Sequence, residues 1–473
     1  MKKIILSLIL LASVVSAQTP DPLALPLIQQ AYYEYVGGCR VPDGTYGASN
    51  FGWSGGGDNA IGGGLAFDPK GNGGAGSLFI SGNYRPRDGG FQGSVAEIAL
   101  CDTWVNSPTP SSLSTAKVLQ NFADVTAGGI ANLEATMGGN QGYIKLAGIG
   151  VEGDNIYFTV FHQYDSGPVL KVSHGSHSRT LSSGALGGFD TLYSTSLLRH
   201  TAGKFANVPS AWQALLGGSM LSGIGNLSVI ETTSHGPAFY SFNPSAIGGS
   251  SGTLISASRL VDYDTAHETL GPWSCRAVCK SNDVYTQATN YGGYAIVPGT
   301  RSALVWGTHA KLPCYGAGTG NPALHGTPFN STFQYCYDPN GIGNEGAHGY
   351  PVEYQMWAYD LKEMAAVKAG TKKYWEPKPY AYWTVKLPVE QSSKIAGGMA
   401  INPTTGDLYV SQYCGEVRNG YCFPILHKFT KAGGRVVEMR ERKIAQWRAL
   451  EFLAFVDGRL LETQMFHGAR LAE

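Results

Sequence analysis

Two histidines that follow apolar strands at matching places are the strongest candidates for chemistry. His162 comes directly after Val160-Phe161, and His309 comes after Trp306-Gly-Thr308. An imidazole near neutral pH can act as a general acid, a general base or a metal ligand. The alternative is a loop histidine that hydrogen-bonds a neighbouring turn. We therefore assign His162 and His309 as the catalytic candidates if the protein is an enzyme.

The segment between Cys314 and Cys336, called the cysteine-bounded segment, carries a second group of candidate residues together with the loop that follows it. Aromatic and imidazole side chains lie within it and just after it: Tyr315, His325, Tyr337 and His348. Long aromatic-rich loops on rigid scaffolds often carry function, and these side chains would suit a sugar or a polymer chain. The alternative is a staple that covers a sheet edge. Asp338, Asn340 and Glu345 offer weak oxygen ligands for Ca²⁺, the one cofactor to consider, but they do not fit an EF-hand loop.

Eight cysteines also bear on the chemistry: Cys39, Cys101, Cys275, Cys279, Cys314, Cys336, Cys414 and Cys422. An even number in an exported chain indicates disulfides. Three pairs are close in sequence, namely Cys275/Cys279, Cys314/Cys336 and Cys414/Cys422, which leaves Cys39 for Cys101. A metal site is the alternative, but the Cys-x2-Cys spacing of a zinc knuckle is missing.

Five short hairpins would position these residues. The clearest copies are Gly-Leu-Ala-Phe-Asp-Pro at 64–69 before a strand at 77–81, and Gly-Met-Ala-Ile-Asn-Pro at 398–403 before a strand at 407–411. The other three begin at residues 147, 236 and 294. Each joins apolar runs of four to six residues through a turn, the signal for buried strands. We predict an all-β fold, a β-propeller with most likely six blades, five to seven being allowed, and a short helical C-terminal extension.

In a propeller, the loops that enter the first strand of each blade and leave the second meet at one mouth. Applied to this chain, that geometry selects a set of polar ligand-binding candidates: Asn59, His235, Asn290 and Lys394 from the entering loops, and Asn83, Arg85, His162 and His309 from the leaving loops.

The two ends of the chain differ from its middle. Residues 1–17 have a basic start, a short apolar core and a Val-Ser-Ala cleavage site, as in a secretory signal peptide. Residues 18–433 form the predicted propeller domain. Residues 434–473 are rich in Arg and Glu with apolar residues at helical spacing, so we predict a helical or poorly ordered extension. It is either a docking tail for self-association or a dispensable end.

Several phrases resemble known families. Leu-Ala-Phe-Asp-Pro at 65–69 and Met-Ala-Ile-Asn-Pro at 399–403 resemble six-bladed propellers of the NHL and gluconolactonase-like type. The segments at 299–309, 323–328, 335–339, 348–352, 355–360 and 375–380 together look like a family of exported bacterial propeller proteins without assigned activity. The resemblance runs from about residue 35 to residue 428. It implies the fold and carries no catalytic residues over to this chain.

Composition narrows the function class. The formal charge is zero with 34 basic and 34 acidic residues, which argues against a nucleic-acid partner. No stretch after the signal is long and apolar enough to span a membrane. Lipase, zincin and P-loop signatures are absent from the sequence. We therefore expect a secreted or periplasmic protein that binds an extracellular small molecule or polysaccharide at one face. A hydrolase or lyase at the channel mouth, assisted by Ca²⁺, and a structural assembly protein are the alternatives.

Overall fold

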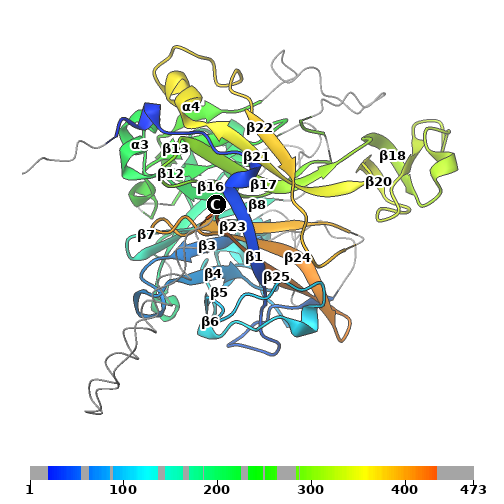
Figure 1. Ribbon diagram of the computed structural model, residues 1–473, viewed down its shortest axis with the longest axis horizontal. Coiled ribbons are helices and arrows are strands. Elements are labelled where there is room, and N and C mark those ends of the chain that lie inside the picture. The colour runs from blue at the N-terminus through cyan, green and yellow to red at the C-terminus, as the bar shows by residue number, and fades with distance from the viewer. Residues whose placement is uncertain are drawn as a thin grey trace, which may run out of the picture.

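A computed structural model shows a β-rich molecule from which one small lobe projects (Figure 1). It describes residues 20–54, 63–85, 89–136, 144–162, 170–184, 186–224, 233–248, 251–263, 284–286, 288–391 and 393–433. The predicted signal peptide and the C-terminal extension lie outside these residues. No described helix is long and apolar enough to cross a membrane.

Five of the sheets make up the body of the molecule, and each begins with a short buried strand. The first contains β3 (Leu65–Asp68), β4 (Ser77–Ser81), β5 (Ser94–Ala99) and β6 (Val118–Asp124), and the second contains β7 (Ile144–Glu152), β8 (Asn155–His162) and β9 (His174–Ser178). The third contains β11 (Phe205–Asn207), β12 (Met220–Ser222), β13 (Phe239–Phe242) and β15 (Ser258–Val261). The fourth contains β16 (Asn290–Ile296), β17 (Ser302–Ala310), β21 (Val352–Asp360) and β22 (Ala381–Thr384).

The fifth sheet joins the two ends of the described chain. It contains β23 (Ala396–Ile401), β24 (Leu408–Arg418), β25 (Tyr421–Lys431) and β1 (Tyr33–Arg40), and β2 (Trp53–Ser54) also pairs with β25. β1 is antiparallel to β25, with Tyr35 opposite Phe429, and the two strands lie side by side in Figure 1. This pairing holds the N-terminal strand through main-chain hydrogen bonds across almost the whole length of the chain.

Two smaller sheets and four α-helices, with several short 3-10 turns, complete the architecture of the described residues. β10 (Thr191–Leu192) is parallel to β14 (Leu254–Ile255), and the lobe contains β18 (Cys314–Thr319), β19 (Gln334–Tyr337) and β20 (Glu345–His348). The helices are α1 (Gly129–Thr136), α2 (Leu198–Thr201), α3 (Ser210–Leu216) and α4 (Leu361–Lys368). Asp360 caps the start of α4, because its side chain accepts a hydrogen bond from the Lys362 N–H at 2.9 Å.

The predicted β-propeller, most likely six-bladed, is wrong. Strands make up 42% and helices 14% of the structure, in seven separate small sheets that form no closed barrel or propeller. The sheets fit a β-sandwich-like class. The physical reason is that a short apolar hairpin reports a strand pair buried on both faces, and it does not report how the sheets pack on one another.

Four of the five predicted hairpins are confirmed, and one is misplaced. The hairpins that begin at residues 64, 147, 294 and 398 are β3–β4, β7–β8, β16–β17 and β23–β24. The apolar run that begins at residue 236 instead forms β13, which lies between β12 and β15. The first strand of that sheet is β11, only three residues long, and it is too short to give a clear alternating pattern.

Each body sheet has one edge strand that packs against the other sheets, and we call it the first strand of that sheet: β3, β7, β11, β16 and β23. β3 contacts β7, β7 contacts β11, β11 contacts β16, β16 contacts β23, and β23 contacts β3. Glycine permits the closest approaches: a Cβ on Gly148 would lie 2.2 Å from the Gly203 carbonyl oxygen, and one on Gly292 would lie 2.1 Å from the Gly397 carbonyl oxygen. Any larger residue at these positions would push two sheets apart.

Candidate functional site

The projecting lobe is the cysteine-bounded segment identified from the sequence. Its central strand β18 pairs in parallel with β19 and antiparallel with β20. Cys314 in β18 and Cys336 in β19 form a disulfide, as predicted. In Figure 1 the lobe stands clear of the five body sheets. Its shape therefore depends on its own cross-links more than on packing against the body.

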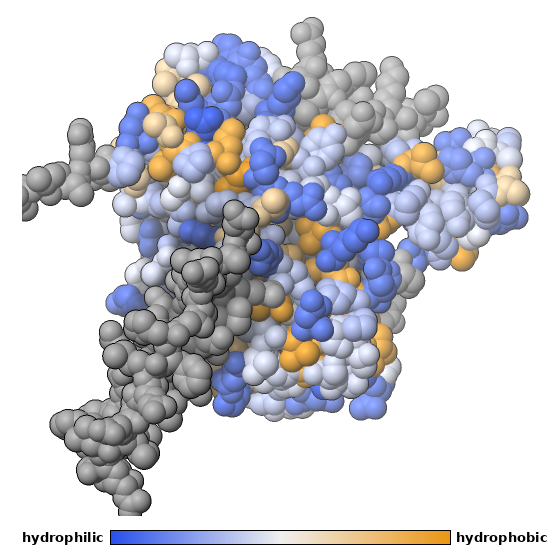
Figure 2. All heavy atoms as spheres, viewed as in Figure 1, coloured by the Kyte–Doolittle hydropathy of each residue, from blue (hydrophilic) through white to orange (hydrophobic). Residues whose placement is uncertain are grey.

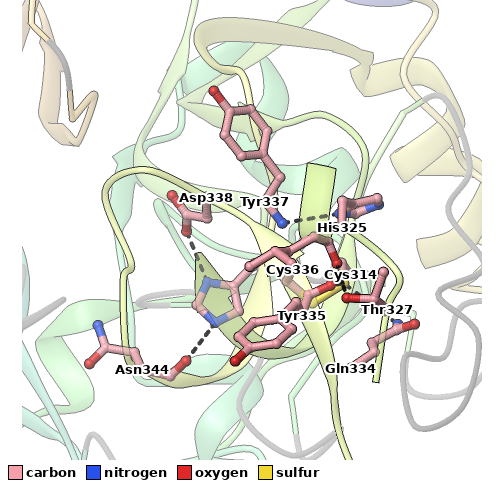
Figure 3. Close-up of a disulfide and its surroundings, with 11 residues drawn as sticks. Cys314, His325, Thr327, Gln334, Tyr335, Cys336, Tyr337, Asp338 and Asn344 are labelled. Carbon is pink, nitrogen blue, oxygen red and sulfur yellow. Dashed lines mark hydrogen bonds and ion pairs between the residues drawn. A yellow bond between two sulfur atoms is a disulfide. The ribbon is translucent and has the colours of Figure 1, made fainter. Parts of the chain in front are cut away.

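His348 connects two parts of the lobe through hydrogen bonds, in addition to the disulfide (Figure 3). Its Nδ1 lies 2.9 Å from the Asp338 carboxylate, and its Nε2 lies 3.0 Å from the Asn344 backbone oxygen. The two contacts hold the ring between two oxygen atoms from different parts of the lobe. His348 is buried. It therefore serves the fold of the lobe, and the sequence prediction of His348 as a ligand-binding residue finds no exposed nitrogen to support it.

The two faces of the lobe sheet differ in chemistry. Cys314 and Cys336 share a face through their disulfide, and the alternation of strand side chains assigns Tyr315, Tyr335 and Tyr337 to the opposite face. All three tyrosines are partly exposed. Figure 3 shows the Tyr337 ring directed away from the disulfide. The lobe thus offers a face of tyrosines on a cross-linked support.

Further aromatic rings extend this tyrosine face. Tyr315 lies 6.0 Å from Phe333, Tyr335 lies 5.1 Å from Phe329 edge-to-face, and Tyr337 lies 5.2 Å from Tyr350, as measured between ring centroids. Such pairs hold the rings in fixed orientations. Figure 2 shows the lobe in mostly blue and pale tones, as expected for a surface of tyrosine and polar residues.

His325 and Asp338, one of the proposed calcium ligands, make hydrogen bonds within the lobe. The His325 Nδ1 accepts the Tyr337 N–H at 3.0 Å, which supports the end of β19. Asp338 is engaged by His348 and also caps the Asn340 N–H at 3.0 Å. Glu345 lies exposed at the start of β20. Across the part of the chain that the structure describes, no group of three or more His, Cys, Asp or Glu side chains could hold a metal ion.

The predicted mouth residues lie at the end of each sheet where first strands begin and second strands finish. The Asn83 Oδ1 accepts the Arg85 N–H at 2.9 Å, so these two lie together after β4. Asn290 starts β16 opposite Thr308, the neighbour of His309 in β17. Other members are placed singly: His162 ends β8, the His235 N–H bonds the Tyr263 oxygen, and Lys394 pairs with Glu390 at 3.7 Å, while Asn59 lies outside the described residues.

The two catalytic candidates differ in burial. His309 is buried, with Nδ1 3.3 Å from the Thr289 hydroxyl and its ring against Trp357. His162 is partly exposed at the end of β8. Their catalytic role stays a prediction.

A buried charge cluster escaped the sequence analysis. The Asp262 carboxylate, fully buried, accepts from His200 Nδ1 at 2.9 Å, from Arg259 at 2.8 Å, and from the Tyr240 hydroxyl. Burial raises the pKa of Asp262, but the hydrogen bond and charge of His200, with the charge of Arg259, outweigh it and hold the pKa below its usual value. Its members lie up to 62 residues apart and form no motif.

The cluster also stores backbone strain. Tyr193 packs edge-to-face on Tyr240 at 5.1 Å and has a φ of +66°, a conformation that bulky residues rarely adopt.

Because Arg259 and Tyr240 already donate to Asp262, the carboxylate is neutralised by several partners at once. This arrangement suits a structural cross-link between α2 and the third sheet better than an Asp–His pair that activates a nucleophile.

The remaining predicted disulfides are confirmed where the structure describes them. Cys39 bonds Cys101, and Cys414 bonds Cys422. Cys275 and Cys279 lie outside the described residues.

Comparison with known proteins does not place the chain in a family. No family model matches it, and no curated protein matches it. The family resemblance noted in the sequence therefore stays untested, and the propeller fold that it implied is not the fold of the described residues.

Proposed function

We propose that the protein binds an extracellular carbohydrate or another surface polymer on the tyrosine face of the lobe. The observation that carries this proposal is the presentation of Tyr315, Tyr335 and Tyr337 on one face of a sheet cross-linked by Cys314–Cys336. Tyrosine combines an apolar ring, which stacks on the C–H face of a sugar, with a hydroxyl that bonds to polar groups. Several such rings on one face of a sheet can contact successive units of an extended chain.

Rigidity of the lobe supports the proposal on energetic grounds. Binding to a flexible loop costs the free energy of ordering it, whereas a pre-organised face loses little. The disulfide and the hydrogen bond between Asp338 and His348 order the lobe before any ligand arrives. Three disulfides among the described residues also agree with folding in an oxidising compartment, so we propose that the protein works outside the cytoplasm, secreted or periplasmic.

Binding to insoluble polysaccharides tests the proposal. The purified chain is incubated with cellulose, chitin and peptidoglycan, and the bound fraction is compared for wild type, Tyr337→Ala and the double variant Tyr315→Ala/Tyr337→Ala. We expect a loss of about tenfold in affinity for each tyrosine, the equivalent of about 1.4 kcal/mol.

A matched control separates this site from general stickiness. Tyr382 in β22 is 46% exposed and lies outside the lobe, so Tyr382→Ala should leave binding unchanged. Equal binding by the lobe variants and the control, or no binding to any polymer of the panel, would contradict the proposal.

A further inference from the structure

A cavity of about 340 Å³ lies where the five first strands approach one another. Its wall contains runs of consecutive residues from β3, β7, β11, β16 and β23 and the turns after them: residues 65–68, 149–152, 205–208, 294–296 and 399–401. We call it the central cavity. Its volume is at the lower end of the range for small-molecule sites, roughly 300–1,000 Å³. None of the described residues predicted from the sequence as ligand-binding or catalytic lines it.

The lining pattern shows that strand edges face the cavity. Successive side chains of a strand point to opposite faces, so a cavity over one face would touch every second residue. This cavity touches three or four consecutive residues of each strand. Each of the five first strands is also the outermost strand of its sheet and has a hydrogen-bonded neighbour on one side only. Its other edge therefore presents backbone N–H and C=O groups to the cavity.

Buried backbone groups require partners, and the side chains around them are apolar. Apolar side chains line the cavity beside the strand edges: Leu65, Phe67, Ile149, Phe205 and Met399. The Val151 backbone oxygen accepts a hydrogen bond from the Asn207 side chain at 2.7 Å, and water or a ligand would satisfy the edge groups that have no protein partner. The wall therefore combines hydrogen-bonding groups in a plane with apolar surfaces above and below it.

The lining of the central cavity extends to the hairpin turns after the first strands, at Pro69, Pro298 and Pro403; we call this the open end and its border the rim. Near the opposite ends of these strands, outside the lining, a Cβ on Gly398 would lie 2.5 Å from the Gly63 carbonyl oxygen, so β23 lies close to the start of β3 there. This rim is on the opposite side of the sheets from the mouth predicted from the sequence, which lies where the first strands begin.

The charges at the open end are paired. Lys70 Nζ lies 3.0 Å from the Asp154 carboxylate, and the Asp68 carboxylate lies 2.9 Å from Arg179. Glu152 adds a further carboxylate to the lining. A rim with neutralised cations and an extra carboxylate disfavours an anionic ligand and accepts a neutral one.

We propose that the central cavity is a second binding site, for a neutral polyhydroxylated molecule of mono- or disaccharide size. Hydroxyl groups both donate and accept, so they match strand edges that offer N–H and C=O groups in alternation. The C–H faces of a sugar ring match the apolar side chains. The site is independent of the tyrosine face in its residues and in its place in the fold.

Saturation-transfer NMR with free glucose, galactose, cellobiose and maltose tests the assignment, with 1-anilinonaphthalene as an apolar probe. Two variants place a bulky ring at the open end: Ser219→Trp and Asn207→Trp, both at lining positions that are not fully buried. Ser183→Trp, at an exposed position away from the cavity, is the matched control. We expect at least one saccharide signal in the wild type and the control, and a loss of at least tenfold in both rim variants.

Two further measurements keep the outcome decisive. Thermal melting shows whether each rim variant is folded, and hydrogen exchange of β3, β7, β11, β16 and β23 in the wild type should slow with the bound saccharide. Tyr337→Ala should leave this binding unchanged, which separates it from the polymer site on the lobe. The proposal is overturned if no saccharide binds, if binding survives both folded rim variants, or if only the apolar probe enters.

Discussion

Removing the Cys314–Cys336 disulfide should unfold the lobe and leave the body of the molecule folded. The bond closes a loop with a sequence separation of 22 residues. On the chain-entropy model, a cross-link over such a loop stabilises the folded state by about 3 kcal/mol. Because the lobe projects from the body (Figure 1), this loss acts on a small sheet with few other supports. Local opening should therefore become more frequent by roughly two orders of magnitude.

Hydrogen exchange read by mass spectrometry is the assay, on the Cys314→Ser/Cys336→Ser variant against the wild type. Peptides from residues 314–348 should exchange about a hundredfold faster, while peptides from β7, β16 and β23 should be unchanged. Polymer binding should fall with the loss of the tyrosine face.

The other disulfides supply controls of different loop length. Cys414–Cys422 spans 8 residues and Cys39–Cys101 spans 62, for which the same model gives about 2.5 and about 4 kcal/mol. Neither change should affect exchange in the lobe. Unchanged protection of residues 314–348 in the lobe variant, or a cooperative loss of protection through all five body sheets, would refute the reasoning that the lobe folds on its own cross-links.

Three further predictions concern buried charge. Asp262→Asn leaves His200 and Arg259 without their carboxylate and should lower the free energy of unfolding by about 3–5 kcal/mol, as measured by denaturant titration, whereas Asp154→Asn, at an exposed ion pair, should leave the free energy of unfolding almost unchanged. Burial lowers the pKa of Lys204 from 10.5 to about 7, so the unfolded state binds more protons between these values; stability should rise with pH from about 7 to about 10, and Lys204→Met should flatten that slope. Burial also lowers the pKa of His174 and His427 from 6.5 to about 3, so both stay neutral in the folded state above that pH. Stability should be lost as the pH falls from about 6.5 toward 3, by up to about 1.4 kcal/mol per pH unit for each, and His427→Gln should lessen the loss.

Local structure was predictable from the sequence wherever a periodic pattern met a turn. The hairpin β3–β4 follows from an apolar run, an Asp-Pro turn and a second apolar run. The start of α4 follows from the capping side chain of Asp360. Three disulfides followed from cysteine spacing and from the pair that remained. The hairpin and the helix cap depend on interactions between residues a few positions apart. The disulfides follow from counting the cysteines and comparing their spacing.

The arrangement of the sheets was not predictable in the same way. β11 has only three residues, and its role as the first strand of the third sheet depends on its contacts with β7 and β16. The segment that forms β13 has a stronger apolar pattern than β11, so the sequence predicts the hairpin at β13 instead of at β11. Contacts between sheets depend on glycine positions such as Gly148, where a neighbouring carbonyl oxygen replaces a side chain, and no pattern in one strand reveals that partner.

The candidate sites differ in the same way: one lies within a single segment of the sequence, and the other is formed by strands far apart in the sequence. Tyr315 and Tyr337 were found because an aromatic-rich segment between two cysteines stands out in the sequence. The central cavity was missed because it is lined by backbone edges, which every residue possesses and which therefore leave no signature in side-chain type. A site of that kind is specified by where five short strands end, and its selectivity comes from the spacing of peptide groups. Substitutions that keep the strands in place should be tolerated along its wall, whereas a single bulky residue at its open end should abolish binding.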